Sequence, residues 1–202
     1  MTETATKGER TRAKLTATAA ALMQRQGYHA TGLSQIVDES GAPRGSLYFH
    51  FPGGKEELAV AALRDVGVVW KTRIETAIEG APDLGAAIVS VCRMFADQLA
   101  ASDWQLGCPL ATVALEASSS SEAVRTVCVE HFRGWEAAIA ARLAASGADP
   151  EAALRMAMFA LATIEGALML ARVERSARPL EIAGEGLRNL VALVAMGVRH
   201  GG

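Results

Sequence analysis

Glycine and proline residues divide the segment from residue 27 to residue 52 into pieces too short for more than about two turns of helix each. Apolar residues at helical spacing occupy residues 33–37, and Gly41 ends that run. Pro43 fits the beginning of a further short helix, because proline lacks the N–H group that a helix start leaves unpaired, and Pro52 stops it. The segment therefore predicts two short helices joined by a tight turn that contains glycine.

Helical spacing continues through the rest of the chain in longer runs. Hydrophobic residues make up 50% of the 202 residues, alanine and leucine are heavily used, and runs of β-branched residues are scarce. This composition is typical of a packed all-α protein. The expected helices span residues 8–26, 33–40, 43–51, 55–79, 84–101, 109–117, 121–146, 150–175 and 180–199.

Two short helices joined by a tight turn form the helix-turn-helix arrangement, whose second helix lies in the major groove of DNA. At about 100° per residue, Leu47 and Phe51 share one side of that second helix and face the core. Gly45, Ser46 and Phe49 then fall on the far side. A phenylalanine exposed beside a glycine suits a surface that presses on nucleic acid, since glycine permits close backbone approach and the ring can contact a thymine methyl.

Charge supports the same interpretation. Residues 1–55 carry seven basic and four acidic groups, net +3, whereas the remainder carries 13 basic and 18 acidic groups, net −5. Tyr48 and His50, at the edges of the far side, can donate to phosphates on the groove walls. The alternative is that these two are ordinary surface residues and Phe49 is core, because short helix pairs occur in many proteins that never bind DNA.

Several classes of protein are disfavoured by the sequence. The amino end lacks the apolar run of a secretory signal, and no later stretch gives about 20 uninterrupted apolar residues, so we expect a cytoplasmic chain with no membrane partner. Cys92, Cys108 and Cys128 match neither a disulfide framework nor paired metal ligands. We expect reduced thiols, no metal and no cofactor.

A resemblance to a known family is carried by Thr11–Leu63, which reads TRAKLTATAAALMQRQGYHATGLSQIVDESGAPRGSLYFHFPGGKEELAVAAL. This segment is similar to the amino-terminal domain of TetR/AcrR-type transcriptional regulators. The resemblance implies an all-α homodimer with a three-helix helix-turn-helix DNA-binding domain, residues 1–54, and a larger helical ligand-binding and dimerisation domain, residues 55–202. The family's DNA-facing positions carry over to Thr31, Arg44, Gly45, Ser46, Tyr48, Phe49, His50 and Lys55. Its core positions carry over to Leu33, Ile36, Leu47 and Phe51.

Two departures from the family pattern affect this transfer of roles. The stretch FPGGKEEL has one residue more than usual, which alters the reach of Lys55 toward a phosphate, and Gly32 replaces a hydroxyl residue, so Thr31 is left to cap the second helix alone. Further along, DWQLGCPLATVALEAS, residues 103–118, resembles a segment of the subgroup that contains lincomycin-efflux and flavonoid-responsive repressors. That resemblance implies control of a transporter or oxidoreductase gene.

The segment Met156–Ala171 is apolar on nearly every side, which a surface helix would not be. We expect it to be buried by its own domain on one side and by a second subunit on another, with the last helix completing a four-helix dimer interface. The alternative is a monomeric core. The expected interface residues are Ala157, Ala160, Ile164, Leu187, Leu190 and Val194.

Bulky and polarisable side chains in the second domain are the expected walls of an effector pocket, although each alone is more often core. Glu165 stands inside the apolar helix and either orients a cationic or hydroxylated effector or pairs with a nearby arginine. The expected effector-binding residues are Trp70, Phe95, Trp104, Cys108, Phe132, Trp135, Phe159 and Glu165.

The sequence thus predicts a regulator that is not an enzyme: a repressor released from a palindromic double-stranded operator by a small hydrophobic effector. One alternative is thiol-based redox sensing through Cys108, which precedes Pro109 at a helix start where a thiolate is favoured. A further alternative is a small thiol or hydrolytic enzyme that combines Cys108 and Glu165 with one of three histidines. Those histidines are His29, His131 and His200.

Overall fold

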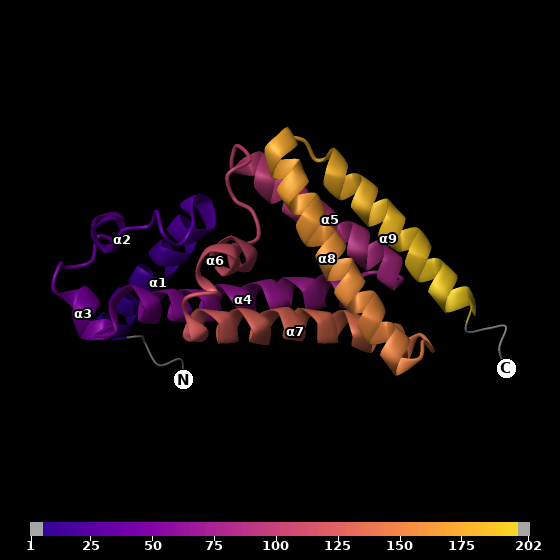
Figure 1. The fold of residues 1–202 in the computed structure, drawn as a ribbon, viewed down its shortest axis with the longest axis horizontal. Coiled ribbons are helices and arrows are strands. Elements are labelled where there is room, and N and C mark those ends of the chain that lie inside the picture. The colour runs from indigo at the N-terminus through magenta and orange to yellow at the C-terminus, as the bar shows by residue number, and fades with distance from the viewer. Residues whose placement is uncertain (1–5, 198–202) are drawn as a thin grey trace. The chain divides into compact units, whose positions relative to one another are not determined.

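The structure is a computed structural model that describes residues 6–197, with the side chains of residues 194–197 excepted. The described residues form nine α-helices and no strand, which confirms the all-α prediction (Figure 1). The helices are α1 Lys7–Gln26, α2 Leu33–Ser40, α3 Ser46–His50, α4 Gly54–Gly80, α5 Leu84–Ala101, α6 Pro109–Ala117, α7 Glu122–Ala145, α8 Pro150–Glu174 and α9 Arg178–Gly197.

The third helix begins later than its proline suggests. Helix α3 starts at Ser46, and Pro43 lies in a turn before it. The Pro43 carbonyl accepts hydrogen bonds from the backbone N–H of Ser46 at 2.8 Å and from its hydroxyl at 2.6 Å. Residues 43–46 therefore form a four-residue turn, and α3 is only about one and a half turns long, shorter than expected.

The chain divides into two compact units that differ from the expected domains. The first unit contains α1 to α3, α4 as far as Val68, α6, and α7 as far as Val129. The second contains the rest of α4 and α7 together with α5, α8 and α9. The domain boundary expected between residues 54 and 55 remains a prediction.

In the first unit, α1 packs against α2, α3 and α6. Leu15 and Met23 on α1 are buried together with Leu47 and Phe51, as their apolar spacing predicts. Helix α1 begins with a capping box in which the Thr6 hydroxyl accepts from the N–H three residues on.

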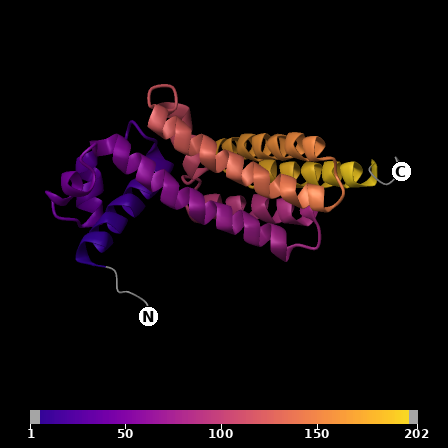
Figure 2. The ribbon, with the colours of Figure 1, turned by 90° about the horizontal axis from the view of Figure 1, so that it is seen from below.

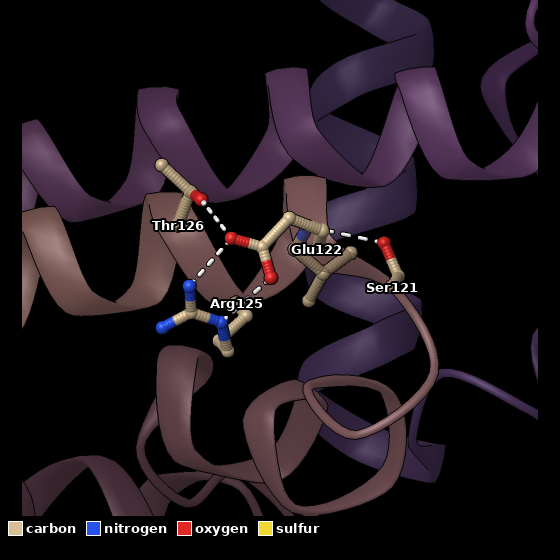
Figure 3. A network of polar contacts seen from close by, with 5 residues as sticks. Ser121, Glu122, Arg125 and Thr126 are labelled. Carbon is tan, nitrogen blue, oxygen red and sulfur yellow. Dashed lines mark hydrogen bonds and ion pairs between the residues drawn. The ribbon is translucent and has the colours of Figure 1, made fainter.

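The start of α7 belongs to the same unit and has a polar cap of its own. The Ser121 hydroxyl accepts from the Val124 N–H at 3.1 Å and donates to a carboxylate oxygen of Glu56. Glu122 receives hydrogen bonds from Arg125 and from the Thr126 hydroxyl one turn on (Figure 3). The bond from the Val124 N–H satisfies one of the backbone donors that a helix start leaves free, and the other bonds join side chains.

In the second unit, α5 packs on α9 and α8, and α8 runs beside α9 (Figure 2). Gly184 lets α9 approach α5 closely, since a Cβ there would stand 3.4 Å from the Cys92 side chain. Two helices, α5 and α8, are long and apolar enough to cross a membrane by length and composition. Both supply buried residues to the core of this unit, such as Phe95 and Leu168, which accounts for their hydropathy.

Candidate DNA-binding surface and internal cavity

Helix α3 presents its aromatic side chains to solvent. Phe49 is 80% exposed and Tyr48 is 64% exposed, whereas Leu47 on the opposite side of the same helix is buried. The Phe49 ring meets the His50 ring edge-on, with centroids 5.0 Å apart. The side of α3 that was expected to face DNA is therefore its solvent-exposed side.

The exposed group at α3 contains most of the residues expected to face DNA. Arg44 and Gly45 are exposed in the turn before the helix, and Ser46 and His50 are half-exposed at its two ends. A Cβ at Gly45 would meet nothing within 4 Å, so the space before α3 is open to an approaching molecule. Contact of these residues with DNA stays a prediction.

Thr31 does not face this surface. Its side chain is buried, its hydroxyl donates to the Gly27 carbonyl at 2.7 Å, and its N–H donates to the Tyr28 carbonyl. The N-cap of α2 is Gly32, which makes no side-chain cap hydrogen bond. The predictions that Thr31 faces DNA and caps α2 are therefore wrong, because its hydroxyl instead closes the turn between α1 and α2.

Lys55 is also held by its own unit. Its ammonium donates to the His29 carbonyl at 3.3 Å and lies 4.6 Å from the centroid of the Tyr28 ring. Burial lowers the pKa of Lys55, and the nearby Glu116 carboxylate opposes that shift. Lys55 therefore supports the turn between α1 and α2, and because its side chain is half-exposed, its contact with DNA stays a prediction.

Glu116 on α6 holds the same turn and was missed by the sequence analysis. Its carboxylate accepts the His29 N–H at 2.8 Å, and its backbone carbonyl lies 3.2 Å from the His29 ring nitrogen Nε2. Gly27, at φ 88° and ψ 171°, leaves the space that the carboxylate fills. No local signal could reveal this contact, since His29 and Glu116 are 87 residues apart.

The second unit contains a small, partly open cavity of about 30 Å³ between α4, α5, α7 and α8. That volume holds roughly one or two water molecules. Apart from the Glu165 carboxyl and the Trp135 indole N–H, the lining side chains are apolar. They are Ile74, Ile78, Leu84, Ala87, Ile88, Val91, Phe95, Trp135, Ile139, Leu161, Ile164 and Glu165.

Three of the residues expected to bind an effector line this cavity: Phe95, Trp135 and Glu165. Two others stand behind its wall. The Trp70 ring stacks on Phe95 with centroids 4.4 Å apart, and the Phe132 ring meets Trp135 edge-on at 5.6 Å. These rings position the lining side chains and do not themselves reach the cavity.

The other three residues expected to bind an effector do not line the cavity. Phe159 is 53% exposed on α8, so it is wrong as a wall residue. Trp104 follows α5 in a loop with φ 62° and does not line the cavity either. Cys108 is buried beside the cavity, and its thiol forms a hydrogen bond with Glu165.

Burial raises the pKa of Glu165 to about 7, and the hydrogen bond from Cys108 partly offsets that shift. Glu165 as a whole is half-buried, but its carboxyl lies among apolar side chains, and these raise its pKa. Among the described residues Glu165 forms no ion pair, so the alternative of an arginine partner is not found there.

The raised pKa of Glu165 should make the free energy of unfolding depend on pH. The pKa is raised above the ordinary 4.5, so from pH 4.5 to about 7 the folded state binds more protons than the unfolded state, and the free energy of unfolding falls. We expect Glu165 to remove about 2 kcal/mol over that interval, after allowance for solvent screening. Urea unfolding across this pH range measures the loss. Glu165→Gln should abolish it, and parallel profiles for the two proteins would contradict this assignment.

The expected dimer interface is mostly internal. Ala157, Ala160, Ile164 and Leu187 are buried within the single chain, and Leu190 is half-buried. The four buried residues form the face of α8 and α9 that packs on their own unit, so they are wrong as interface residues, whereas Leu190 stays a prediction. The side chain of Val194 lies outside the described residues. Large apolar side chains are instead exposed on other faces of α8 and α9, at Leu154, Met158, Phe159, Met169, Leu170, Val173, Ile182 and Leu193.

Comparison with known proteins agrees with these features in both parts of the chain. Residues 15–62 match the family described as bacterial regulatory proteins, tetR family. Residues 85–186 match the C-terminal domain of LmrA/YxaF-like transcriptional regulators.

Individual relatives cover almost the whole chain. The chain is 39% identical over 180 residues to YxaF of Bacillus subtilis, an uncharacterized HTH-type transcriptional regulator, covering 89% of this chain and 94% of YxaF. It is 34% identical over 169 residues to the HTH-type transcriptional regulator LmrA of the same organism, covering 84% and 90% of the two chains. A TetR transcriptional regulator from Chloroflexus aurantiacus has a similar fold, with a TM-score of 0.79, 30% identity and coverage of 92% and 96%.

The helix-turn-helix unit and the helical second unit define a DNA-binding transcriptional regulator. The chain belongs to the TetR family, and its carboxyl-terminal domain is of the LmrA/YxaF-like type. Regulators of this family bind operator DNA and act as dimers.

Proposed function

We propose that this protein is a cytoplasmic, ligand-responsive repressor, not an enzyme, that leaves a palindromic operator when a small, mainly apolar effector enters the second unit. One observation carries the proposal: the apolar cavity has Ile74 and Ile78 of α4 in its wall, and the first turns of the same helix belong to the unit that contains α3. A ligand that moves this wall moves a helix shared with the DNA-binding unit.

The size of the cavity supports a two-state mechanism. Sites for small molecules usually enclose about 300 to 1,000 Å³, far more than the roughly 30 Å³ found here. Binding must therefore displace wall side chains and favour a second, expanded conformation. Operator affinity then falls by the ligand's preference for the expanded state, about 1 to 3 kcal/mol in typical allosteric coupling.

Thiol sensing is the less supported alternative. Cys108 is buried, and its thiol is engaged by the Glu165 carboxyl and not by a second thiol. All three cysteines are free and buried, and burial raises the pKa of Cys92 and Cys128 to about 11. A redox sensor needs an accessible, easily ionised thiol, which this arrangement does not favour.

Phe49 gives the test of the DNA-binding half of the proposal. Phe49→Ala should weaken binding to the protein's own upstream DNA by about tenfold, because the exposed ring loses its contact with a base. Fluorescence anisotropy at fixed salt measures the affinity, and operator release by apolar compounds is followed in the same assay.

Leu115→Ala is the matched control for that substitution, since Leu115 is an equally exposed apolar residue on α6. Neither change should alter thermal stability by more than about 0.5 kcal/mol. Undiminished DNA binding by Phe49→Ala would remove α3 from the proposed interface.

We also propose that the exposed apolar residues of α8 and α9 form the homodimer interface. A two-fold axis through this face would join two copies, and a palindromic operator requires the two α3 helices of a dimer to reach half-sites about 34 to 36 Å apart, one turn of DNA. The face includes Met158, which is 60% exposed, and Val173 near the end of α8. Monomers rarely leave so continuous an apolar face open to water.

Charge on that face should separate the subunits. Met158→Glu combined with Phe159→Glu should give folded monomers, because two carboxylates per subunit would be desolvated at the interface. Sedimentation velocity measures the mass, and circular dichroism should show unchanged helicity. The control, Leu115→Glu, should sediment like the wild type. A doubly substituted protein that stays dimeric at micromolar concentration would refute this interface.

A further inference from the structure

An open groove of about 360 Å³ lies between α2 and α3 in the first unit. Part of its lining is apolar and comes from Leu33, Val37 and Leu47. The rest of its lining is polar, and these side chains are all exposed: Ser34, Asp38, Arg44 and Tyr48. The groove therefore continues the exposed surface of α3 onto α2 and adds hydrogen-bonding groups to it.

The four polar side chains of this groove are not engaged within the subunit. None of them forms a hydrogen bond or an ion pair with another residue in the part of the chain that the structure describes. Glu39, next to Asp38, differs in this respect, because its carboxylate accepts from the Gln35 side-chain amide at 2.9 Å. Asp38 thus presents a carboxylate with unused acceptor capacity beside the DNA-binding helix.

The place of Asp38 in α2 does not stabilise that helix. Asp38 lies in its last turn, where unpaired backbone carbonyls leave a partial negative charge that disfavours an acidic side chain. That turn has no basic residue to offset the effect. Since the carboxylate is neither bonded nor favoured within the folded subunit, its role is in recognition of a partner.

The chemistry of that partner limits what Asp38 can bond to. Regulators of this family bind operator DNA, and α3 is the helix that we expect to enter the major groove. Phosphates repel a carboxylate, and a base edge that covers it removes its water. In the major groove adenine, guanine and thymine each present an acceptor atom, whereas cytosine presents only the donor N4 amino group. Cytosine is therefore the base that a carboxylate fits.

We propose that Asp38 selects a cytosine in each operator half-site by accepting a hydrogen bond from its N4 amino group. Any other base at that position leaves the carboxylate desolvated and facing an acceptor, so Asp38 acts mainly by weakening the binding of wrong sequences. Arg44 in the same groove supplies attraction to DNA, and the Tyr48 hydroxyl can donate to a phosphate. The inference rests on the DNA-facing role proposed for α3 and adds to it a specificity-determining residue on α2.

Selection from a library of random DNA duplexes tests the proposal with the full-length protein. The wild type should prefer cytosine at one position of the half-site by about tenfold, and Asp38→Ala should lose that preference and keep the others. Glu39→Ala is the matched control, since it removes the same charge from the same turn but lies outside the groove. It should select the same half-sites as the wild type. Unchanged cytosine selection by Asp38→Ala overturns the proposal.

N4-Methylcytosine in the selected operator tests the contacting atom. The modified base still pairs with guanine, but its methyl group replaces the amino hydrogen that faces the major groove. By fluorescence anisotropy, the wild type and Glu39→Ala should bind this duplex about tenfold more weakly than the unmodified one. Asp38→Ala should bind both duplexes equally. If Asp38 acts only by orienting Arg44, wild-type affinity does not depend on the amino group, and equal wild-type binding to the two duplexes overturns the proposal.

Phe49→Ala separates this inference from the proposed DNA-binding surface. If Phe49→Ala loses operator affinity while Asp38→Ala keeps its base selection, the role of Asp38 is wrong and the α3 surface stands. If neither variant changes DNA binding, the surface and the role of Asp38 are both wrong. Asp38 is exposed, so Asp38→Ala should keep the thermal stability of the wild type, and its loss of selection cannot come from unfolding.

Discussion

Ala160→Glu should unfold the second unit and not merely separate two subunits. Ala160 is 0% exposed on the inward face of α8, so a carboxylate placed there would be removed from water. An uncompensated buried charge costs about 3 to 5 kcal/mol, and the added volume in a close-packed site raises that figure. This is a large part of the roughly 5 to 15 kcal/mol that stabilises a typical domain. Urea unfolding followed by circular dichroism measures the loss.

Met158→Glu is the matched control, since it places the same side chain on the same helix at a residue that is 60% exposed. It should keep the folded helicity and the urea midpoint of an unassociated subunit. Sedimentation distinguishes the two outcomes, because unfolded Ala160→Glu should aggregate or sediment as an expanded chain. A compact, stable monomer from Ala160→Glu would show that the inward face of α8 has been assigned to the wrong side.

Gly27→Ala should destabilise the first unit by about 3 kcal/mol, for two reasons that act together. The backbone at Gly27, with φ 88° and ψ 171°, lies in a region that residues with a Cβ essentially never occupy. An added Cβ would also stand 2.0 Å from an oxygen of Glu116. The other oxygen of this carboxylate would lie 2.9 Å from the Cβ and accepts from the His29 N–H, so a shift of the carboxylate also disturbs that bond. Thermal unfolding and operator affinity both measure the effect.

A control and a double-mutant cycle separate the two reasons. Gly41 has φ 64° and no atom within 4 Å of an added Cβ, so Gly41→Ala should cost only the strain of a left-handed residue, about 1 to 2 kcal/mol. In a Glu116→Ala background, Gly27→Ala should cost less than in the wild type, because the clash is gone and the backbone strain remains. Equal costs in both backgrounds would show that Glu116 does not hold this turn.

Local pattern was sufficient for the helices. Within the described residues, capping residues and apolar spacing predict the ends of eight of the nine helices to within about two residues, because these signals act within one or two turns of chain. The expected end of the last helix, at residue 199, lies outside the described residues. The exception is the start of α3, where the hydrogen bond from Ser46 to Pro43 decides between a helix and a turn. The fixed φ of Pro43 is compatible both with the first residue of a helix and with the first residue of a turn, so the proline alone does not distinguish them.

The candidate sites were less predictable, because they depend on which side of a helix is covered. Helix α8 is apolar on nearly every side, so its spacing alone could not tell that Ala157 faces inward and Met158 outward. The prediction that Phe159 lines the effector cavity was wrong for the same reason. Exposure of Phe49 could be predicted, since α3 has a single buried side. Glu116 and Thr31 act through tertiary contacts and buried turns, for which the sequence carries no local signal.

The small size of the cavity has a consequence for the rate of the proposed effector response. A space of about 30 Å³ with no room for an effector means that ligand entry waits for the core around Trp135 to open. Association should then approach a limiting rate as effector concentration rises, set by opening on the microsecond to millisecond scale of collective helix motion and not by diffusion. A bound effector can leave only through the same slow opening of the core, so its dissociation should also be slow. A brief pulse of effector would therefore leave a derepressed interval that outlasts the pulse itself.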